Sequence, residues 1–131
     1  MSLFRVNIVA ISPRDESRRT QPIEVLVDTG SELTWLPAGL LEQAGIERRR
    51  ERSFLTANRE SVTRSVGYAI LAVDEHETAD EVVFAEPSDM ALLGVRTIEG
   101  FGVLVDNVAH RFVAQATIVA PRGAGQHPRS V

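Results

Sequence analysis

The sequence has no cysteine and no lysine, and aromatic residues make up only 5% of it. The absence of cysteine excludes disulfide bonds, thiolate metal sites and a cysteine nucleophile. All 14 basic residues are arginine, which we attribute to genome base composition, and 18 acidic residues outnumber them. The net charge of -4 gives no general basic field, so we expect no nucleic-acid partner.

Long apolar runs are also missing. No stretch of about 20 apolar residues occurs, so the sequence predicts no membrane-spanning helix and no membrane partner. The N-terminus alternates apolar and polar residues and lacks the apolar core of a signal peptide, which favours a cytoplasmic protein. Neither a phosphate-binding loop nor a dinucleotide-binding glycine pattern is found, and we expect no cofactor.

The residues that are present suit one globular domain. The chain has 131 residues, of which 44% are hydrophobic and 24% are charged, close to ordinary globular usage. We expect a domain over residues 1–120, followed by a disordered tail over 121–131 that is rich in glycine, proline and arginine.

The apolar pattern predicts an all-β fold of about eight or nine short strands. The expected strands cover residues 3–11, 23–27, 33–36, two arms within 54–73, 82–85, 91–93, 103–105 and 111–119. One short helix is expected over 37–45, because Pro37 can begin it and Gly45 can follow it in the left-handed conformation. A single helical turn is expected over 97–100. Polar segments over 13–22 and 74–80 are predicted loops, and the arginines of 48–52 a solvated surface.

The strongest candidate for chemistry lies at the end of the apolar run 23–27. The run ends in a single carboxylate, Asp28, and turn-forming residues Thr29 and Gly30 follow at once. Apolar surroundings raise the pKa of a carboxyl group and nearby donors lower it, so such a position can tune protonation. Gly30 permits a close turn and offers an unobstructed N–H group. Taken alone, however, Asp-x-Gly is ordinary turn chemistry between strands.

Further features follow in a fixed order along the chain. The apolar run 33–36 is followed by a predicted hairpin over 54–66 and then by Leu92-Leu93-Gly94 and the segment 95–100. Over about residues 3–119 this order resembles the retropepsin-like aspartic proteases, the single-domain relatives of pepsin. The nearest likeness is to soluble bacterial and archaeal members of that family. The resemblance implies an all-β, closed acid-protease barrel with one short helix.

The resemblance also implies an aspartic endopeptidase that acts on peptide or protein substrates as a two-fold symmetric homodimer. Hydrolysis of this type needs one carboxylate as a base on water and a second, protonated one to polarise the scissile carbonyl and later protonate the leaving amine. The chain has a single Asp-Thr-Gly, so each subunit would supply one Asp28. Thr29 and Gly30 complete the implied catalytic loop. The implied substrate-binding residues are Ser31, Ala57, Asn58, Arg59, Leu92, Leu93 and Gly94.

Two departures from the family pattern are visible. The candidate flap over 54–66 has no glycine, and Val95 separates Gly94 from Arg96, where retroviral members often have arginine directly after the glycine. An alternative hypothesis is a retropepsin-fold peptide-binding or dimerisation module without significant proteolytic activity. A peptide-binding flap should become ordered on adding a transition-state mimic, whereas a purely structural hairpin should not respond.

The remaining carboxylates are weaker candidates. His76-Glu77-Thr78-Ala79-Asp80 approaches the zinc-protease pattern His-Glu-x-x-His, but Asp80 stands in place of the second histidine. The segment is also too short and loop-like to place two ligands on one helix face, so we expect no metal site. Asp106 ends an apolar strand without a following Thr-Gly and is predicted to form a turn.

Overall fold

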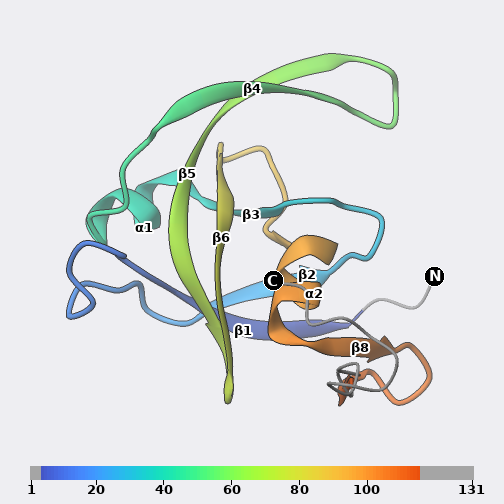
Figure 1. Cartoon of the computed structure of the whole chain (residues 1–131). Coiled ribbons are helices and arrows are strands. Elements are labelled where there is room, and N and C mark those ends of the chain that lie inside the picture. Colours follow the sequence, from blue (N-terminus) through green and yellow to red (C-terminus); the bar gives the residue numbers. More distant parts are fainter. Residues whose placement is uncertain (1–3, 116–131) are drawn as a thin grey trace, which may run out of the picture.

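The computed structural model describes residues 4–115, which form nine strands and two short helices (Figure 1). The elements, in chain order, are β1 (Arg5–Ile11), β2 (Ile23–Val27), β3 (Thr34–Pro37), α1 (Ala38–Gln43), β4 (Arg50–Leu55), β5 (Ser61–Val73), β6 (His76–Ala85), β7 (Leu92–Leu93), α2 (Val95–Phe101), β8 (Val103–Asp106) and β9 (Arg111–Ala114). None of the helices in this part of the chain is long and apolar enough to cross a membrane.

Seven strands form one sheet that returns on itself. The strand order is β1-β2-β7-β3-β6-β5-β4, and β1 pairs with β5 as well as with β2. Because the second half of the long β5 pairs with β1 between Ile70 and Ala72, six of the strands make a ring of hydrogen-bonded neighbours. The apolar core lies inside this ring and includes Ile8, Val25, Leu36, Leu71 and Phe84, all almost fully buried.

The sequence of each ring strand matches its surroundings. β1 and β2 alternate between buried and more exposed residues, as expected for strands with one face on the core. The last five residues of β6 are all buried, since this part pairs with β3 on one side and β5 on the other and is covered on both faces. Burial on both faces explains why this stretch is apolar after Glu81, its one charged residue.

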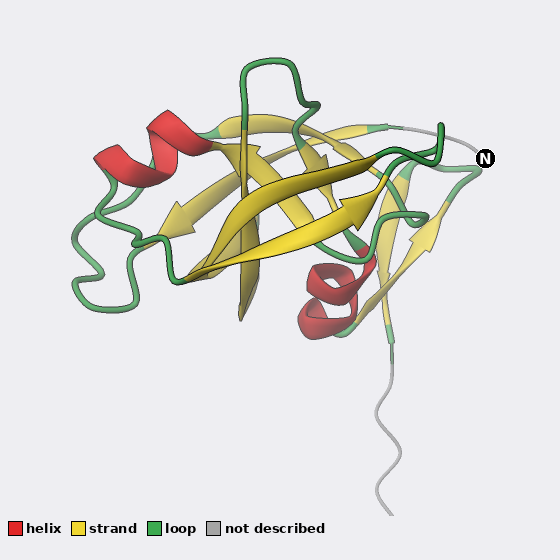
Figure 2. Cartoon of the chain, turned by 90° about the horizontal axis from the view of Figure 1, so that it is seen from above, coloured by secondary structure: helices red, strands yellow, loops and turns green. Residues whose placement is uncertain are grey.

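The first half of β5 leaves the ring and pairs with β4 as a hairpin that arches over the rest of the molecule (Figures 1 and 2). The aromatic rings of Trp35 and Phe54 lie 5.0 Å apart beneath the arch. They pack against a small apolar cluster of Leu33, Val66 and Val83. This second cluster fixes the base of the hairpin on β3 and β6.

The strands β8 and β9 form a separate two-stranded hairpin. Its turn is held by the Asp106 carboxylate, which accepts hydrogen bonds from the backbone N–H groups of Val108 and Ala109, each at 3.0 Å. The predicted turn-forming role of Asp106 is therefore confirmed. The two N–H donors also lower the pKa of the Asp106 carboxyl group.

Several sequence predictions are confirmed, with shifts of a few residues at element ends. The strand at 23–27, the helix within 37–45 and the two hairpin arms are present. Gly45 has the predicted positive φ of 80°. The expected strand ends at residue 3 and over 116–119, together with the tail over 121–131, lie outside the described residues.

The structure corrects or extends the sequence predictions at three places. Residues 76–80 belong to β6 and are not an acidic loop. The arginines of 48–52 are mostly exposed, as predicted, but Arg50–Arg52 also begin β4, and Arg52 is half-buried beside Glu81. The single turn at 97–100 is a seven-residue helix, α2, so the described residues hold two short helices and not one. In β4 and β6 charged side chains masked the element, because Arg50, Arg52 and Asp80 find partners within the fold.

Gly67 marks the point where β5 runs closest to another segment. A Cβ atom there would overlap the backbone carbonyl oxygen of Glu47 and crowd the Phe84 ring. We expect Gly67→Ala to lower the free energy of unfolding by about 2–3 kcal/mol in urea denaturation, because backbone cannot yield as a flexible side chain does.

Gly39 provides the matched control. It lies exposed in α1, and a Cβ atom there would meet nothing within 4 Å. Gly39→Ala should leave stability unchanged or raise it by up to about 1 kcal/mol. Equal losses in the two variants would show that steric overlap at Gly67 is not the cause.

Candidate functional site

The two motifs that sequence analysis singled out lie side by side. β2 and β7 pair in parallel, with Leu26 opposite Leu92 and Val27 opposite Leu93. The pairing continues into the loop, where the Asp28 N–H group donates to the Leu93 carbonyl at 3.0 Å. Segments more than 60 residues apart in the sequence therefore meet at the point where the carboxylate emerges.

The loop after β2 is shaped by the carboxylate itself. The Gly30 N–H group donates to Asp28 Oδ1 at 2.9 Å, and the Ser31 N–H group donates to the Asp28 carbonyl at 3.1 Å. Asp28 is half-buried, whereas Thr29 and Gly30 are exposed. Among the described residues Oδ2 of Asp28 accepts no hydrogen bond, so one carboxylate oxygen is committed to the loop and the other is available.

The first residues of α2 donate hydrogen bonds to the end of this loop. The Val95 N–H group donates to the Ser31 carbonyl at 2.8 Å, and the Arg96 N–H group donates to the Glu32 carbonyl at 3.1 Å. The Ser31 hydroxyl donates to the Leu33 carbonyl at 2.8 Å. Gly94 lies so close that a Cβ atom there would overlap the Leu33 carbonyl, which explains the glycine at this position.

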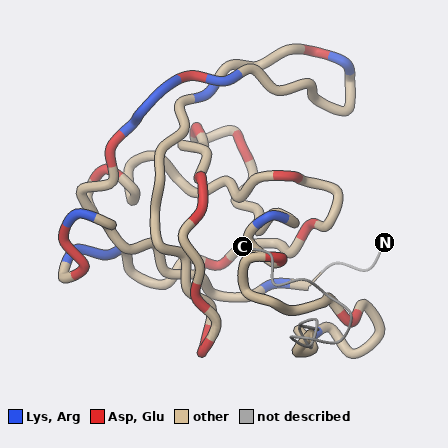
Figure 3. The backbone as a smooth tube through the Cα atoms, in the orientation of Figure 1, with Lys and Arg blue, Asp and Glu red and all other residues tan. Residues whose placement is uncertain are grey.

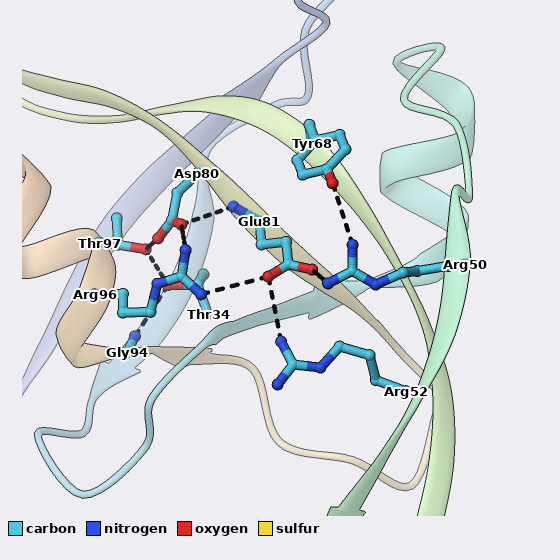
Figure 4. A network of polar contacts seen from close by, with 9 residues as sticks. All are labelled: Thr34, Arg50, Arg52, Tyr68, Asp80, Glu81, Gly94, Arg96 and Thr97. Atoms are coloured by element: carbon cyan, nitrogen blue, oxygen red, sulfur yellow. Dashed lines mark hydrogen bonds and ion pairs between the residues drawn. The ribbon is translucent and has the colours of Figure 1, made fainter.

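A buried relay of hydrogen bonds supports the contact between the loop and α2 (Figure 4). The Gly94 N–H group donates to Thr34 Oγ1 at 3.0 Å, and the Thr34 and Thr97 hydroxyls lie 2.7 Å apart. Thr97 Oγ1 donates to Asp80 Oδ2 at 2.9 Å. Since Thr97 gives its only proton to Asp80, the proton between the two threonines comes from Thr34, and the relay has one direction. Both threonines are fully buried.

Asp80 and its neighbour Glu81 then connect α2 to the hairpin (Figure 4). Arg96 bridges the two acids, with Nη2 at 3.3 Å from Asp80 Oδ1 and Nη1 at 3.4 Å from Glu81 Oε1. Glu81 also binds Arg50 and Arg52 of β4, the latter at 3.2 Å. Its side chain is only 6% exposed, so one nearly buried carboxylate collects three guanidinium groups. Sequence reasoning missed this cluster, although arginines at alternate positions 50 and 52 are a signal that they share a strand face.

The predicted substrate-binding residues fall into two groups. Ala57, Asn58 and Arg59 are exposed at the hairpin tip, where the Thr56 N–H group donates to the Glu60 carbonyl at 2.8 Å. The positive φ of the tip, 65°, falls on Arg59. The other group lies at the loop after β2, where Ser31 and Leu92 are half-buried and Leu93 and Gly94 are buried. No hydrogen bond within residues 4–115 joins the tip to the loop.

A second ion pair holds the other strand of the hairpin, β5. Arg64 of β5 binds the Asp89 carboxylate through Nε at 2.7 Å and Nη2 at 3.0 Å. Asp89 also accepts the Glu86 N–H group at 2.8 Å, and both paired side chains are mostly buried. The Arg64 guanidinium lowers the pKa of the Asp89 carboxyl group. The pair joins the hairpin to the segment that leads into β7.

The acidic segment considered as a metal site has a different role. Within the described residues, no three histidine, aspartate or glutamate side chains come together as a metal site. His76 packs against the rings of Phe101 and Phe112, and Asp80 serves the relay.

Comparison with known proteins gives a family and a fold. Residues 19–99 match the sequence model of a family described as gag-polyprotein putative aspartyl protease. The structure is similar to that of a foamy viral protease-reverse transcriptase in complex with an RNA/DNA hybrid, with a TM-score of 0.54 and 16% identity, covering 89% of this chain and 13% of that chain. A foamy viral protease-reverse transcriptase in complex with double-stranded DNA matches with a TM-score of 0.49 and 18% identity, over 72% of this chain and 15% of that one. No curated protein matches the sequence.

The relay predicts a specific loss of stability. Thr34→Val keeps the branched shape but removes the acceptor for the buried Gly94 N–H group. We expect the free energy of unfolding to fall by about 1–3 kcal/mol in urea denaturation. Thr63→Val is the control, because the Thr63 hydroxyl lies on the surface, 3.3 Å from Ser53 Oγ. This control should stay within about 0.5 kcal/mol of wild type. Similar losses in both variants would argue against the relay.

The Arg64–Asp89 pair predicts a pH-dependent effect. A carboxyl group with a lowered pKa in the folded state stabilises the protein above its unfolded pKa of about 3.9, and this contribution disappears as pH falls through the folded value. Asp89→Asn should therefore cost about 1–2 kcal/mol near pH 7. The gap from wild type should narrow below about pH 4.

Glu47→Gln is the control for charge removal, because the Arg14–Glu47 pair is exposed, with side chains 74% and 54% accessible. It should cost less than about 1 kcal/mol. A gap for Asp89→Asn that stays constant from pH 7 to pH 3 would contradict the ion-pair interpretation.

Proposed function

The chain belongs to the gag-polyprotein putative aspartyl proteases, a retropepsin-like family, and on this premise we propose that it is an aspartic endopeptidase whose water is activated between two Asp28 carboxylates. The observation that carries the proposal is the arrangement of Asp28 itself. One oxygen is fixed by the Gly30 N–H group, and Oδ2 accepts no hydrogen bond from the described residues. A carboxylate held in this way can present its second oxygen to a water molecule.

The chemistry requires a second carboxylate, because two acids in contact share one proton and divide the acid and base roles between them. The chain supplies one Asp-Thr-Gly, so the partner is a second copy related by a two-fold axis. In the proposal the ring of strands is the closed barrel of the family. Thr29, exposed beside Asp28, contacts the partner loop across the axis.

The surface on this side of the molecule suits a second copy. The loop after β2, the hairpin tip and the β8–β9 hairpin all lie toward the same edge in both views (Figures 1 and 2). Leu104 and Val113 of the β8–β9 hairpin are exposed by 55% and 39%, and Val108 at its turn by 94%. Exposed apolar side chains of this kind are typical of surfaces that a partner covers.

The proposed substrate is an extended peptide held between the hairpin and the catalytic loop. A peptide strand can hydrogen-bond to the hairpin backbone, while Ser31 and the tip residues Ala57, Asn58 and Arg59 lie along its path. Leu92 contributes the half-buried apolar wall next to the loop. Leu93 and Gly94 are buried, so in this proposal they support the loop and do not contact the peptide directly.

Asp28→Asn tests the catalytic assignment. We expect cleavage of a peptide library, read by mass spectrometry from acidic to neutral pH, to fall by about 10³-fold or more, because an amide cannot act as the base. Asp74→Asn is the control: Asp74 lies exposed in the β5–β6 turn with φ of 52°, which asparagine tolerates well. Cleavage that persists in Asp28→Asn would place the catalytic group elsewhere.

Mixing the variant with wild type tests the shared site. After subunit exchange at equal amounts, about half of the wild-type subunits have an inactive partner, and activity per wild-type subunit should fall by about half. Activity unaffected by the variant would contradict a site built from two subunits. Absence of cleavage by every preparation would favour the peptide-binding module over the enzyme.

A further inference from the structure

An open cleft lies between the base of the hairpin and α2, apart from the catalytic loop. It has a volume of about 480 Å³ and is lined by Arg50, Tyr68, Ala79, Asp80, Glu81 and Arg96. Figure 4 shows the guanidinium groups of Arg50 and Arg96 approaching Glu81 from opposite sides, with the Tyr68 hydroxyl beside Arg50.

The cleft lining is balanced in formal charge, with Arg50 and Arg96 against Asp80 and Glu81. Arg52 adds a third guanidinium group from outside the lining, where it binds Glu81. The acids are the buried members, with side chains 7% and 6% exposed, whereas Arg50 and Arg96 remain 48% and 42% exposed. The acids therefore lie beneath and the arginines face solvent, so an incoming group meets the guanidinium groups first. Figure 3 shows the arginines of 48–52 as basic segments of the tube that runs into β4, with the acidic Glu51 among them.

The exposed donors are also held in place. Arg50 donates through Nη1 to the Tyr68 hydroxyl at 3.1 Å and through Nη2 to Glu81. Because the Tyr68 oxygen accepts this bond, its own proton is left to donate, and it has no acceptor among the described residues. The Arg96 backbone is fixed to the catalytic loop by its bond to the Glu32 carbonyl. Donors fixed before binding lose little side-chain entropy when an anion arrives.

The cleft walls belong to the two elements that would enclose a bound peptide. Arg50 comes from the hairpin strand β4, and Arg96 follows the Leu92-Leu93-Gly94 element by two residues. We propose that this cleft is a specificity subsite that binds an acidic side chain of the peptide, aspartate or glutamate, at a position away from the scissile bond. The inference rests on the proposed function only in so far as an extended peptide lies beneath the hairpin.

Peptide binding to the full-length Asp28→Asn variant tests this subsite without cleavage. The probes are paired pools of fluorescent decapeptides in which one position at a time is glutamate in one pool and glutamine in the other. We expect the glutamate pool to bind at least about fivefold more tightly at one register, because the carboxylate gains charge-assisted hydrogen bonds. The preference should shrink in about 1 M salt, where exposed charges are screened.

Three variants in the same background separate the cleft from general charge. Arg50→Gln should bring the glutamate-to-glutamine ratio close to one, and Arg50→Lys should retain part of it. Arg49→Gln removes the same charge at the neighbouring position, whose guanidinium lies 5.8 Å from the centre of the Tyr68 ring and does not line the cleft, and should keep the full ratio. Circular dichroism confirms that each variant is folded before binding is compared.

Each outcome decides the inference independently of the catalytic proposal. Equal binding of the two pools, a preference that survives Arg50→Gln, or no binding of either pool would overturn the subsite. Cleavage by wild type without a glutamate preference would support the proposed enzyme and contradict the subsite. A glutamate preference that depends on Arg50, in a protein that cleaves nothing, would support the subsite and contradict the proposed enzyme.

Discussion

The position of Asp28 depends on the hydrogen-bonded contact between the loop after β2 and the start of α2. The loop has no regular structure of its own, and its backbone groups are satisfied by Leu93, Val95 and Arg96. Close approach is possible because Gly94 has no side chain, and it is held in register by the relay through Thr34 and Thr97 to Asp80. Every buried side-chain polar atom of the described residues has a partner, as a rigid polar interior requires. In the proposed homodimer, a loose loop would leave the carboxylate unable to meet its counterpart on the second copy.

The acidic pair Asp80 and Glu81 on β6 connects the start of α2 to the hairpin. Asp80 faces the relay and Glu81 faces β4, and Arg96 touches both. Buried ionic networks add little net stability, but removing one member strongly destabilises the protein because a buried charge is left unpaired. Together with the Arg64–Asp89 pair, the network fastens both strands of the hairpin near its base. The residues beyond these ties, from Leu55 to Ser61, form no ion pair with the rest of the described chain.

The loop after β2 and its neighbour β7 could be predicted from sequence because their signals are local. An apolar strand followed by Asp28, Thr29 and Gly30 is contiguous, and its supporting Leu92-Leu93-Gly94 is recognisable by order along the chain. The strand β6 could not be predicted in full, since its first five residues include Glu77 and Asp80 and alternate between half-buried and exposed positions. Only the partners Thr97 and Arg96 explain why Asp80 lies in a strand. The same holds for Arg50 and Arg52: charge indicates solvent until Glu81 is placed beside them. Local patterns thus predicted the loop, and long-range pairing determined its support.

The hairpin tip contains no glycine and differs from the base, which ion pairs hold in place. Positive φ at Arg59 costs about 1 kcal/mol relative to glycine, which narrows the conformations open to the tip without locking it. The turn is instead organised by Thr56, whose backbone and hydroxyl both bond to Glu60, the hydroxyl at 3.1 Å. A tip preshaped by such bonds loses less entropy on closing over a peptide than a glycine-rich one would. For the proposed peptide complex, the absence of glycine therefore favours a preformed hairpin, and selectivity would then depend on the side chains that this hairpin presents, among them the arginines at its base.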